Sequence, residues 1–224
     1  MGAEAIQPEK PEGPSERPSE PAAEAPADDA AAVASAAKEP ILALVAIRDV
    51  GIVSALLTLW GTADLWAEST GLGLATLVSV VNGILVGAGI TGLAHEWGHF
   101  VGARLSGATA PLAPAKGFLP LYDFDFQKSE VSQFQAMSIG GHVPTWGLVL
   151  LLAWALPLDS PGRIALVSAA VGFSLFASVV EFPVMSRVSG GMAPLESLSK
   201  IDRQTFTTAA LSGAVGALLL AALL

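Results

Sequence analysis

Long apolar runs separated by short polar segments dominate the chain after Pro40. A helix needs about 20 mostly apolar residues to cross the hydrocarbon core of a bilayer. Runs of roughly this length or longer lie at 50–67, 74–106, 136–157, 162–185 and 205–224. The pattern therefore predicts an all-α, polytopic membrane protein with about five transmembrane helices, embedded in a lipid bilayer.

Two of these runs leave an alternative open. Arg48-Asp49 interrupts the apolar stretch that starts at Ile41, so residues 41–49 can lie along the membrane interface instead of inside the bilayer. The second run would be about 50 Å long as one helix, at 1.5 Å per residue. It must either project well beyond the bilayer or break near Asn82-Gly83.

The connection at 107–133 has a different pattern. Residues 121–126 alternate between apolar and polar side chains, which predicts a short membrane-associated β segment near 119–127. Tyr122, Phe124 and Phe126 would share one face of it. Asp123 and Asp125 would form its solvated face rather than bind a metal.

Residues 1–40 differ from the rest in composition. They hold nine acidic and three basic residues and seven of the fifteen prolines, so we expect a disordered, acidic, Pro/Ala/Glu-rich tail. It would act either as a solubilising segment or as a regulatory one. Residues 41–224 would form the transmembrane domain.

Composition and charge narrow the function classes. Only 14% of the residues are charged, whereas soluble domains usually contain about a quarter. The chain has no cluster of basic residues that would indicate a nucleic-acid partner. The absence of cysteine excludes disulfides and thiolate metal sites. Ten of the eleven basic residues fall in 1–49, 104–133 and 186–204, so the N-terminus is expected to be cytoplasmic. We expect the protein to lie in a bacterial inner (cytoplasmic) membrane.

The second run contains His95-Glu96-Trp97-Gly98-His99. Histidines four residues apart project from one face of a helix, so both imidazoles can bind a single Zn²⁺. Glu96 is placed to act as a general base for a water molecule that zinc makes more acidic. Ionisable residues are costly inside an apolar span and usually mark function there.

A catalytic zinc site usually has a third protein ligand. His142 and Glu181 lie in the third and fourth predicted spans, at a depth similar to that of the histidine motif. Glu181 is the preferred third ligand and His142 the alternative. The opposing interpretation is a hydrogen-bonded polar cluster without a metal.

The segment from Gly92 to Gly107 resembles the signature helix of the site-2 protease family of intramembrane zinc metalloproteases. Weaker similarity covers Ser138-Ile-Gly-Gly-His-Val-Pro-Thr145, where Thr145 stands at the family's asparagine position. In the stretch 183–191, Ser189 stands where the family has an aspartate ligand. The chain departs from the family at both positions.

The resemblance implies an endopeptidase that hydrolyses a peptide bond in or near a transmembrane helix of another membrane protein. A helical substrate must unwind locally before its carbonyl can be attacked, and the β segment, with Phe124, could pair with the unwound strand. Two rival functions stay open: a pseudoprotease that binds membrane proteins without cleaving them, and a transporter or channel component that uses the buried groups for protons.

Overall fold

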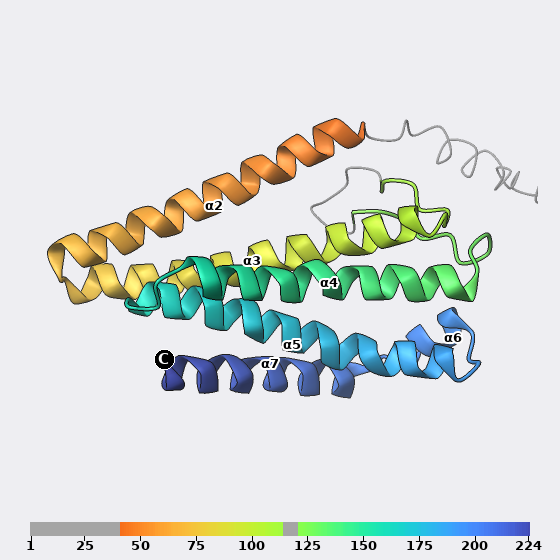
Figure 1. Cartoon of the computed structure of the whole chain (residues 1–224). Helices are drawn as coiled ribbons and strands as arrows, with labels where there is room; N and C mark the ends of the chain where they lie inside the picture. The colour runs from red at the N-terminus through yellow and green to blue at the C-terminus, as the bar shows by residue number, and fades with distance from the viewer. Residues whose placement is uncertain (1–40, 114–120) are drawn as a thin grey trace, which may run out of the picture. The chain divides into compact units, whose positions relative to one another are not determined.

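The computed structural model describes residues 41–113 and 121–224, so the predicted tail at 1–40 lies outside the described residues. The described residues form six helices and no strand (Figure 1). The helices are α2 (Leu42–Thr70), α3 (Gly73–Leu105), α4 (Val131–Ala155), α5 (Pro161–Ser189), α6 (Pro194–Leu198) and α7 (Arg203–Leu223). All except the short α6 are long and apolar enough to cross a membrane. The chain is a multi-pass membrane protein, and the predicted all-α, five-span architecture is confirmed.

The first span is longer than the apolar pattern predicts. α2 begins at Leu42 and passes through Arg48-Asp49 without interruption, so residues 41–49 do not form a separate segment. The helix accommodates the buried Asp49 carboxylate because two donors face it. Arg48 Nε lies 2.7 Å from one carboxylate oxygen, and the Trp97 indole N–H donates to the other at 2.8 Å.

The second span is one continuous helix. α3 runs for 33 residues and does not break at Asn82-Gly83. A methyl group added at Gly83 would lie 2.5 Å from the Gly162 carbonyl oxygen. This glycine therefore serves the close approach of α3 to α5 and does not end the helix.

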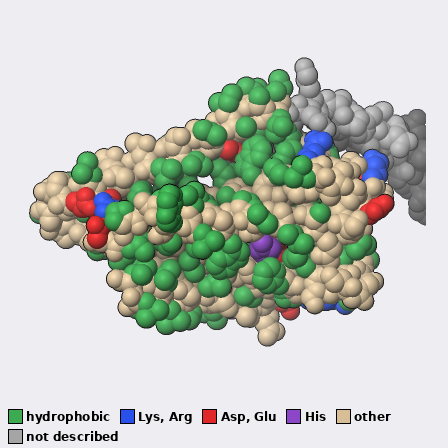
Figure 2. Space-filling model, in the orientation of Figure 1, with side chains coloured by type: hydrophobic (Ala, Val, Ile, Leu, Met, Phe, Trp, Pro, Cys, Tyr) green, Lys and Arg blue, Asp and Glu red, His purple; other side chains and the backbone are tan. Residues whose placement is uncertain are grey.

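His95 and His99 lie on α3 and Glu181 lies on α5, the two innermost helices, whereas the alternative ligand His142 lies on α4. α3 packs against α2, α4 and α5, and α5 packs in addition against α4 and α7. In Figure 1 the N-terminal part of α2 diverges from α4, and an apolar groove of about 1000 Å³ lies between α2, α3 and α4. Apolar side chains cover much of the face seen in Figure 2, while charged side chains gather towards its two ends. This distribution fits a protein that crosses a bilayer.

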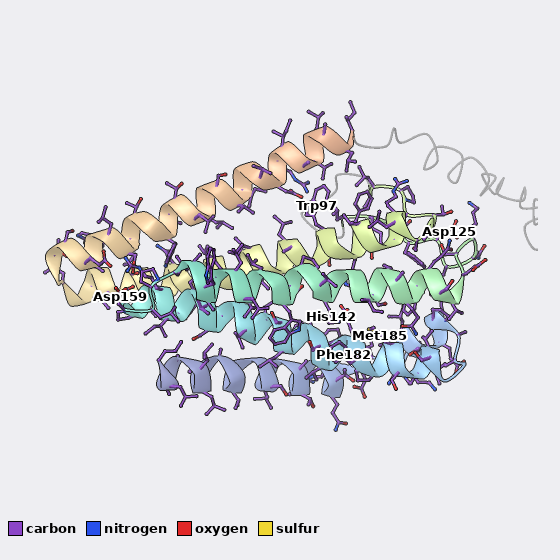
Figure 3. All side chains as sticks on the ribbon, in the orientation of Figure 1. Trp97, Asp125, His142, Asp159, Phe182 and Met185 are labelled. Atoms are coloured by element: carbon purple, nitrogen blue, oxygen red, sulfur yellow. The ribbon has the colours of Figure 1, made fainter. Side chains whose placement is uncertain are left out.

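A buried network of polar groups joins α2, α3 and α5 at one end of the helices. Asp64 accepts hydrogen bonds of 2.8 Å from Ser79 Oγ and from Ser160 Oγ. Its second carboxylate oxygen lies 2.9 Å from Arg163 Nε. Asp159, labelled at this end in Figure 3, also pairs with Arg163 but is exposed. One buried carboxylate thus holds groups from three segments that are distant in sequence.

We expect Asp64→Ala to lower the free energy of unfolding in detergent by about 3–5 kcal/mol, because it leaves buried donors without their acceptor. Asp159→Ala removes an exposed ion pair of the same arginine and should cost under about 1 kcal/mol. Chemical unfolding followed by circular dichroism measures both values. Equal losses in the two variants would contradict a special role for the buried network.

One antiparallel bridge, Leu112 with Tyr122, joins the two described parts of the connection between α3 and α4. The backbone hydrogen bonds run from Ala113 N to Leu121 O, from Asp123 N to Pro111 O and from Asp125 N to Thr109 O. The β segment predicted near 119–127 is therefore a bridge with short extended pairing and not a strand, and residues 119–120 lie outside the described part. Backbone groups alternate in direction along an extended chain. The amides and carbonyls of Tyr122 and Phe124 consequently face away from residues 109–113.

Candidate metal centre

The two histidines of the motif lie one turn apart on the buried face of α3. His95 and His99 are 5% and 8% exposed, and their Nε2 atoms are 3.0 Å apart. Glycines let α4 approach these rings closely. A methyl group added at Gly141 would overlap the His99 ring, and one added at Gly98 would overlap the Gly140 carbonyl. The predicted pairing of the two imidazoles on one helix face is present.

Helix α4 fixes how each histidine presents its nitrogens. His99 Nδ1 lies 2.9 Å from the Met137 carbonyl oxygen, which can only accept, so Nδ1 carries the proton. His95 Nδ1 lies 3.1 Å from Thr145 Oγ1. The Thr145 hydroxyl donates to the Gly141 carbonyl at 2.6 Å and is left to accept from His95. Assigned from these partners, both neutral imidazoles direct an unprotonated Nε2 away from α4.

Glu181 of α5 supplies the third atom of the cluster. Its Oε1 lies 2.8 Å from His95 Nε2 and 3.3 Å from His99 Nε2. With the tautomers set by α4, all three atoms are electron-pair acceptors that face one another with no proton between them. Such an arrangement is stable only if a cation or an additional proton occupies the centre.

The distances fit a small tetrahedral cation. Zinc binds histidine nitrogen and carboxylate oxygen at about 2.0–2.1 Å, which places neighbouring ligand atoms of a tetrahedron about 3.3 Å apart. The three measured separations are 2.8, 3.0 and 3.3 Å. Two imidazoles and one carboxylate also form a ligand set that catalytic zinc sites use. His95, His99 and Glu181 are the described residues that together can hold a metal ion.

His142 lies beside the cluster and contacts the carboxylate from behind. Its Nε2 is 3.1 Å from Oε2 of Glu181, the oxygen that does not face His95 and His99. Figure 3 shows His142 of α4 next to Phe182 of α5, and their ring centroids are 4.6 Å apart. Of the two predicted candidates for the third ligand, Glu181 lies against both histidine Nε2 atoms, and His142 lies on the other side of its carboxylate.

Ser189 does not take part in this cluster. It lies eight residues after Glu181, at the exposed C-terminal end of α5, and its hydroxyl accepts a hydrogen bond from Gln135. Eight residues of helix correspond to about 12 Å. The carboxylate that approaches the histidines therefore comes from the same helix, about two turns before the position that the family resemblance indicates.

Glu96 lines a cavity next to the histidine pair, which is distinct from the apolar groove between α2, α3 and α4. A cavity of about 310 Å³ is lined by Glu96, His99 and Glu181 together with mostly apolar side chains. No described residue forms a hydrogen bond or an ion pair with the Glu96 carboxylate. The Glu96 carboxylate thus stabilises no contact within the described part of the fold. It is available to accept a proton from a molecule in the cavity.

The aromatic residues of the α3–α4 connection form part of the same cavity wall. Tyr122, Phe124 and Phe126 all line it, as their predicted common face requires. Asp125 points elsewhere: its carboxylate accepts from the amides of Gln127 and Lys128, and the Lys128 side chain lies 3.1 Å away. The hydrogen bond from Lys128 holds the pKa of Asp125 below its usual range. Asp125 is therefore paired within its own loop and does not belong to the cluster of His95, His99 and Glu181.

The roles of Thr145 and Met137 are not predicted by the sequence. Thr145 is noticeable only as a departure from the family pattern, and its contact with His95 depends on how α3 and α4 pack. Met137 acts through its backbone carbonyl, which has no signature in the side-chain sequence. Groups that orient metal ligands are typically of these kinds.

We expect Thr145→Val to weaken zinc binding by about 10- to 100-fold, because His95 loses the partner that fixes its tautomer and orientation. Thr145→Ser keeps the hydroxyl and serves as the matched control, with an affinity close to wild type. Competition against a chromophoric chelator measures the dissociation constants. Wild-type affinity in the valine variant would show that the Nδ1 contact does not support the ligand.

Comparison with known proteins adds no family assignment to this geometry. The chain matches no protein-family profile, no curated protein and no solved structure. Its function must therefore be inferred from the arrangement of His95, Glu96, His99 and Glu181 and from the cavity beside them.

Proposed function

We propose that the chain is an intramembrane zinc metalloendopeptidase, a divergent relative of the site-2 proteases. The observation that carries the proposal is the convergence of three acceptor atoms, from His95, His99 and Glu181, beside an unpartnered glutamate that lines a cavity. A proton-carrying cluster explains the three acceptors but gives no use for Glu96. A zinc peptidase explains both.

Each residue has a definite task in this proposal. His95, His99 and Glu181 would hold zinc, and His142 would keep the Glu181 carboxylate turned towards the histidines. Zinc would supply Lewis-acid activation of water and of the scissile carbonyl. Glu96 would take the proton from the attacking water and deliver it to the leaving amine. The packed helices shield the two histidines from bulk solvent.

The proposed substrate is a membrane protein with a transmembrane helix. Such a helix must unwind before its carbonyls are accessible, because they are already hydrogen-bonded. The outward edge of residues 121–125 offers the unpaired amides and carbonyls of Tyr122 and Phe124, next to the cavity that contains Glu96. An unwound substrate strand can pair with this edge and gain the hydrogen bonds that it lost.

Phe124→Pro tests this pairing. Proline removes an outward amide that residues 109–113 do not use, so the hydrogen bonds within the connection remain. Phe124→Ala loses the same buried ring but keeps the amide, and it is the matched control. We expect the proline variant to cleave a transmembrane peptide about 5-fold more slowly than the alanine variant, since one hydrogen bond contributes about 1 kcal/mol. Equal rates would exclude pairing through this amide.

A second candidate function is a pseudoprotease that binds membrane proteins without cleaving them. The serine at position 189, where the family has an aspartate ligand, favours it. The approach of Glu181 to both histidines weighs against it, because that carboxylate can replace the missing ligand. We further propose that the protein lies in a bacterial inner membrane. The distribution of basic residues supports a cytoplasmic N-terminus.

The proposal is tested by presenting the reconstituted protein with a library of peptides that represent transmembrane segments. Mass spectrometry then identifies newly formed termini. We expect cleavage within apolar segments that stops when zinc is removed by a chelator and returns when zinc is added. Stoichiometric zinc without any cleavage would favour the pseudoprotease, and cleavage that is unaffected by chelation would exclude a metallopeptidase.

A further inference from the structure

Tyr122 is the only tyrosine of the chain, and it lines the cavity that contains Glu96, His99 and Glu181. Its ring packs near Phe100 of α3, with a centroid distance of 6.1 Å. The bridge to Leu112 holds its backbone. No described residue forms a hydrogen bond with its hydroxyl. A positioned phenol that the fold does not use therefore faces the site of the proposed reaction.

The surroundings keep this phenol protonated. Burial raises the pKa of Tyr122, and the negative charges of Glu96 and Glu181 raise it further. At neutral pH the hydroxyl is therefore a hydrogen-bond donor. A donor is what the carbonyl oxygen of a peptide bond requires when negative charge develops on it during attack by water.

The other polar side chains near the cluster are largely committed. The Thr145 hydroxyl donates to Gly141 and accepts from His95, and the Trp97 indole donates to Asp49. His142 Nε2 lies 3.1 Å from Glu181 and its Nδ1 has no hydrogen-bond partner among the described residues, but His142 does not line the cavity that contains Glu96. Ser138 also lines the cavity and is the remaining hydroxyl there. A phenol is more acidic than an aliphatic hydroxyl, so Tyr122 is the stronger donor to an oxyanion.

We infer that the Tyr122 hydroxyl donates a hydrogen bond to the carbonyl oxygen of the scissile peptide bond and stabilises the charge that develops there. This inference rests on the proposed peptidase function and assigns it a further catalytic residue. It also gives the connection between α3 and α4 a chemical role. The same extended segment would then hold the substrate strand through its backbone and stabilise the transition state through one side chain.

Tyr122→Phe is the direct test, because phenylalanine keeps the ring packing and removes only the hydroxyl. Kinetics use the transmembrane peptide that the wild-type protein cleaves best. We expect kcat to fall about 100-fold, the usual effect of losing one oxyanion donor, with little change in KM, zinc content or Tm. A phosphinate analogue of that peptide carries the charge of the transition state and should bind the variant more weakly by a similar factor. The cleaved product peptide should bind both proteins equally.

Ser138→Ala is the comparison for the second hydroxyl in the cavity. If Tyr122→Phe cleaves as fast as wild type, or if only Ser138→Ala loses activity and phosphinate affinity, the inference is overturned and the proposed function stands. A wild-type protein that holds zinc but neither cleaves any peptide nor binds the phosphinate overturns both. The rate ratio of the two variants thus reports on Tyr122, and wild-type turnover reports on the function.

Incorporation of fluorotyrosine provides a second measurement that does not depend on a side-chain truncation. Since the chain has one tyrosine, the label alters Tyr122 alone and makes its phenol more acidic. Since a more acidic phenol donates a stronger hydrogen bond to an oxyanion, we expect kcat at neutral pH to rise along a series of increasingly acidic fluorotyrosines, with Tm unchanged. A kcat that does not depend on phenol acidity would overturn the inference, because a purely structural ring is insensitive to it.

Discussion

Purified wild-type protein is expected to hold about one zinc ion per chain, and His99→Ala to hold none. The variant removes one of three converging ligand atoms and leaves a site with too few donors for a structural or catalytic zinc. Metal analysis after reconstitution and removal of excess zinc measures the content directly. Because His99 also packs against Gly141, His99→Gln keeps most of the side-chain volume and separates loss of metal from loss of packing.

Three further variants identify the third ligand. Glu181→Ala should lose zinc as His99→Ala does, because Oε1 lies within 3.3 Å of both histidine nitrogens. His142→Ala should retain zinc with an affinity about 10- to 100-fold lower, as expected for a group that orients a ligand. Ser189→Ala, at the position where the family has its aspartate, should bind as wild type does. Loss of zinc in His142→Ala with retention in Glu181→Ala would reverse the assignment.

The pairing of the two histidines and the architecture could be predicted because both depend on local patterns. Apolar run length predicts a membrane-spanning helix whatever the tertiary contacts are, and a spacing of four places His95 and His99 on one face of any helix. The ends of the helices are harder to predict from the sequence, because they depend on contacts with other segments. α2 includes Asp49 because Trp97, which is distant in sequence, donates to its carboxylate.

The rest of the site depends on contacts between helices, which a single sequence does not encode locally. The packing of α3, α4 and α5 places Glu181, and not His142, against the Nε2 atoms of both His95 and His99. Thr145 orients His95 only because Gly98 and Gly141 bring α4 close to α3. The role of Tyr122 depends on a bridge between two parts of a loop.

Glu96→Gln is expected to lower the rate of peptide cleavage by about 10²–10⁴-fold while zinc binding is preserved. The amide has nearly the same shape as the carboxylate but cannot accept a proton from water. Glu96 is absent from the group of residues that can hold a metal, so its charge is not needed there. Single-turnover kinetics on the peptide cleaved by wild type, together with metal analysis of the same sample, measure both quantities.

Glu196→Gln makes the same chemical change at an exposed position at the α6 end of the helices and should leave the rate unchanged. If Glu96→Gln lost zinc, Glu96 would be a ligand and the convergence on Glu181 would need another explanation. If it bound zinc and cleaved normally, the proton would be taken by another group, and the unpartnered carboxylate in α3 would have no assigned use. Catalysis accounts for the presence of the half-buried Glu96, which no described residue neutralises, only if the variant retains zinc and loses most of its rate.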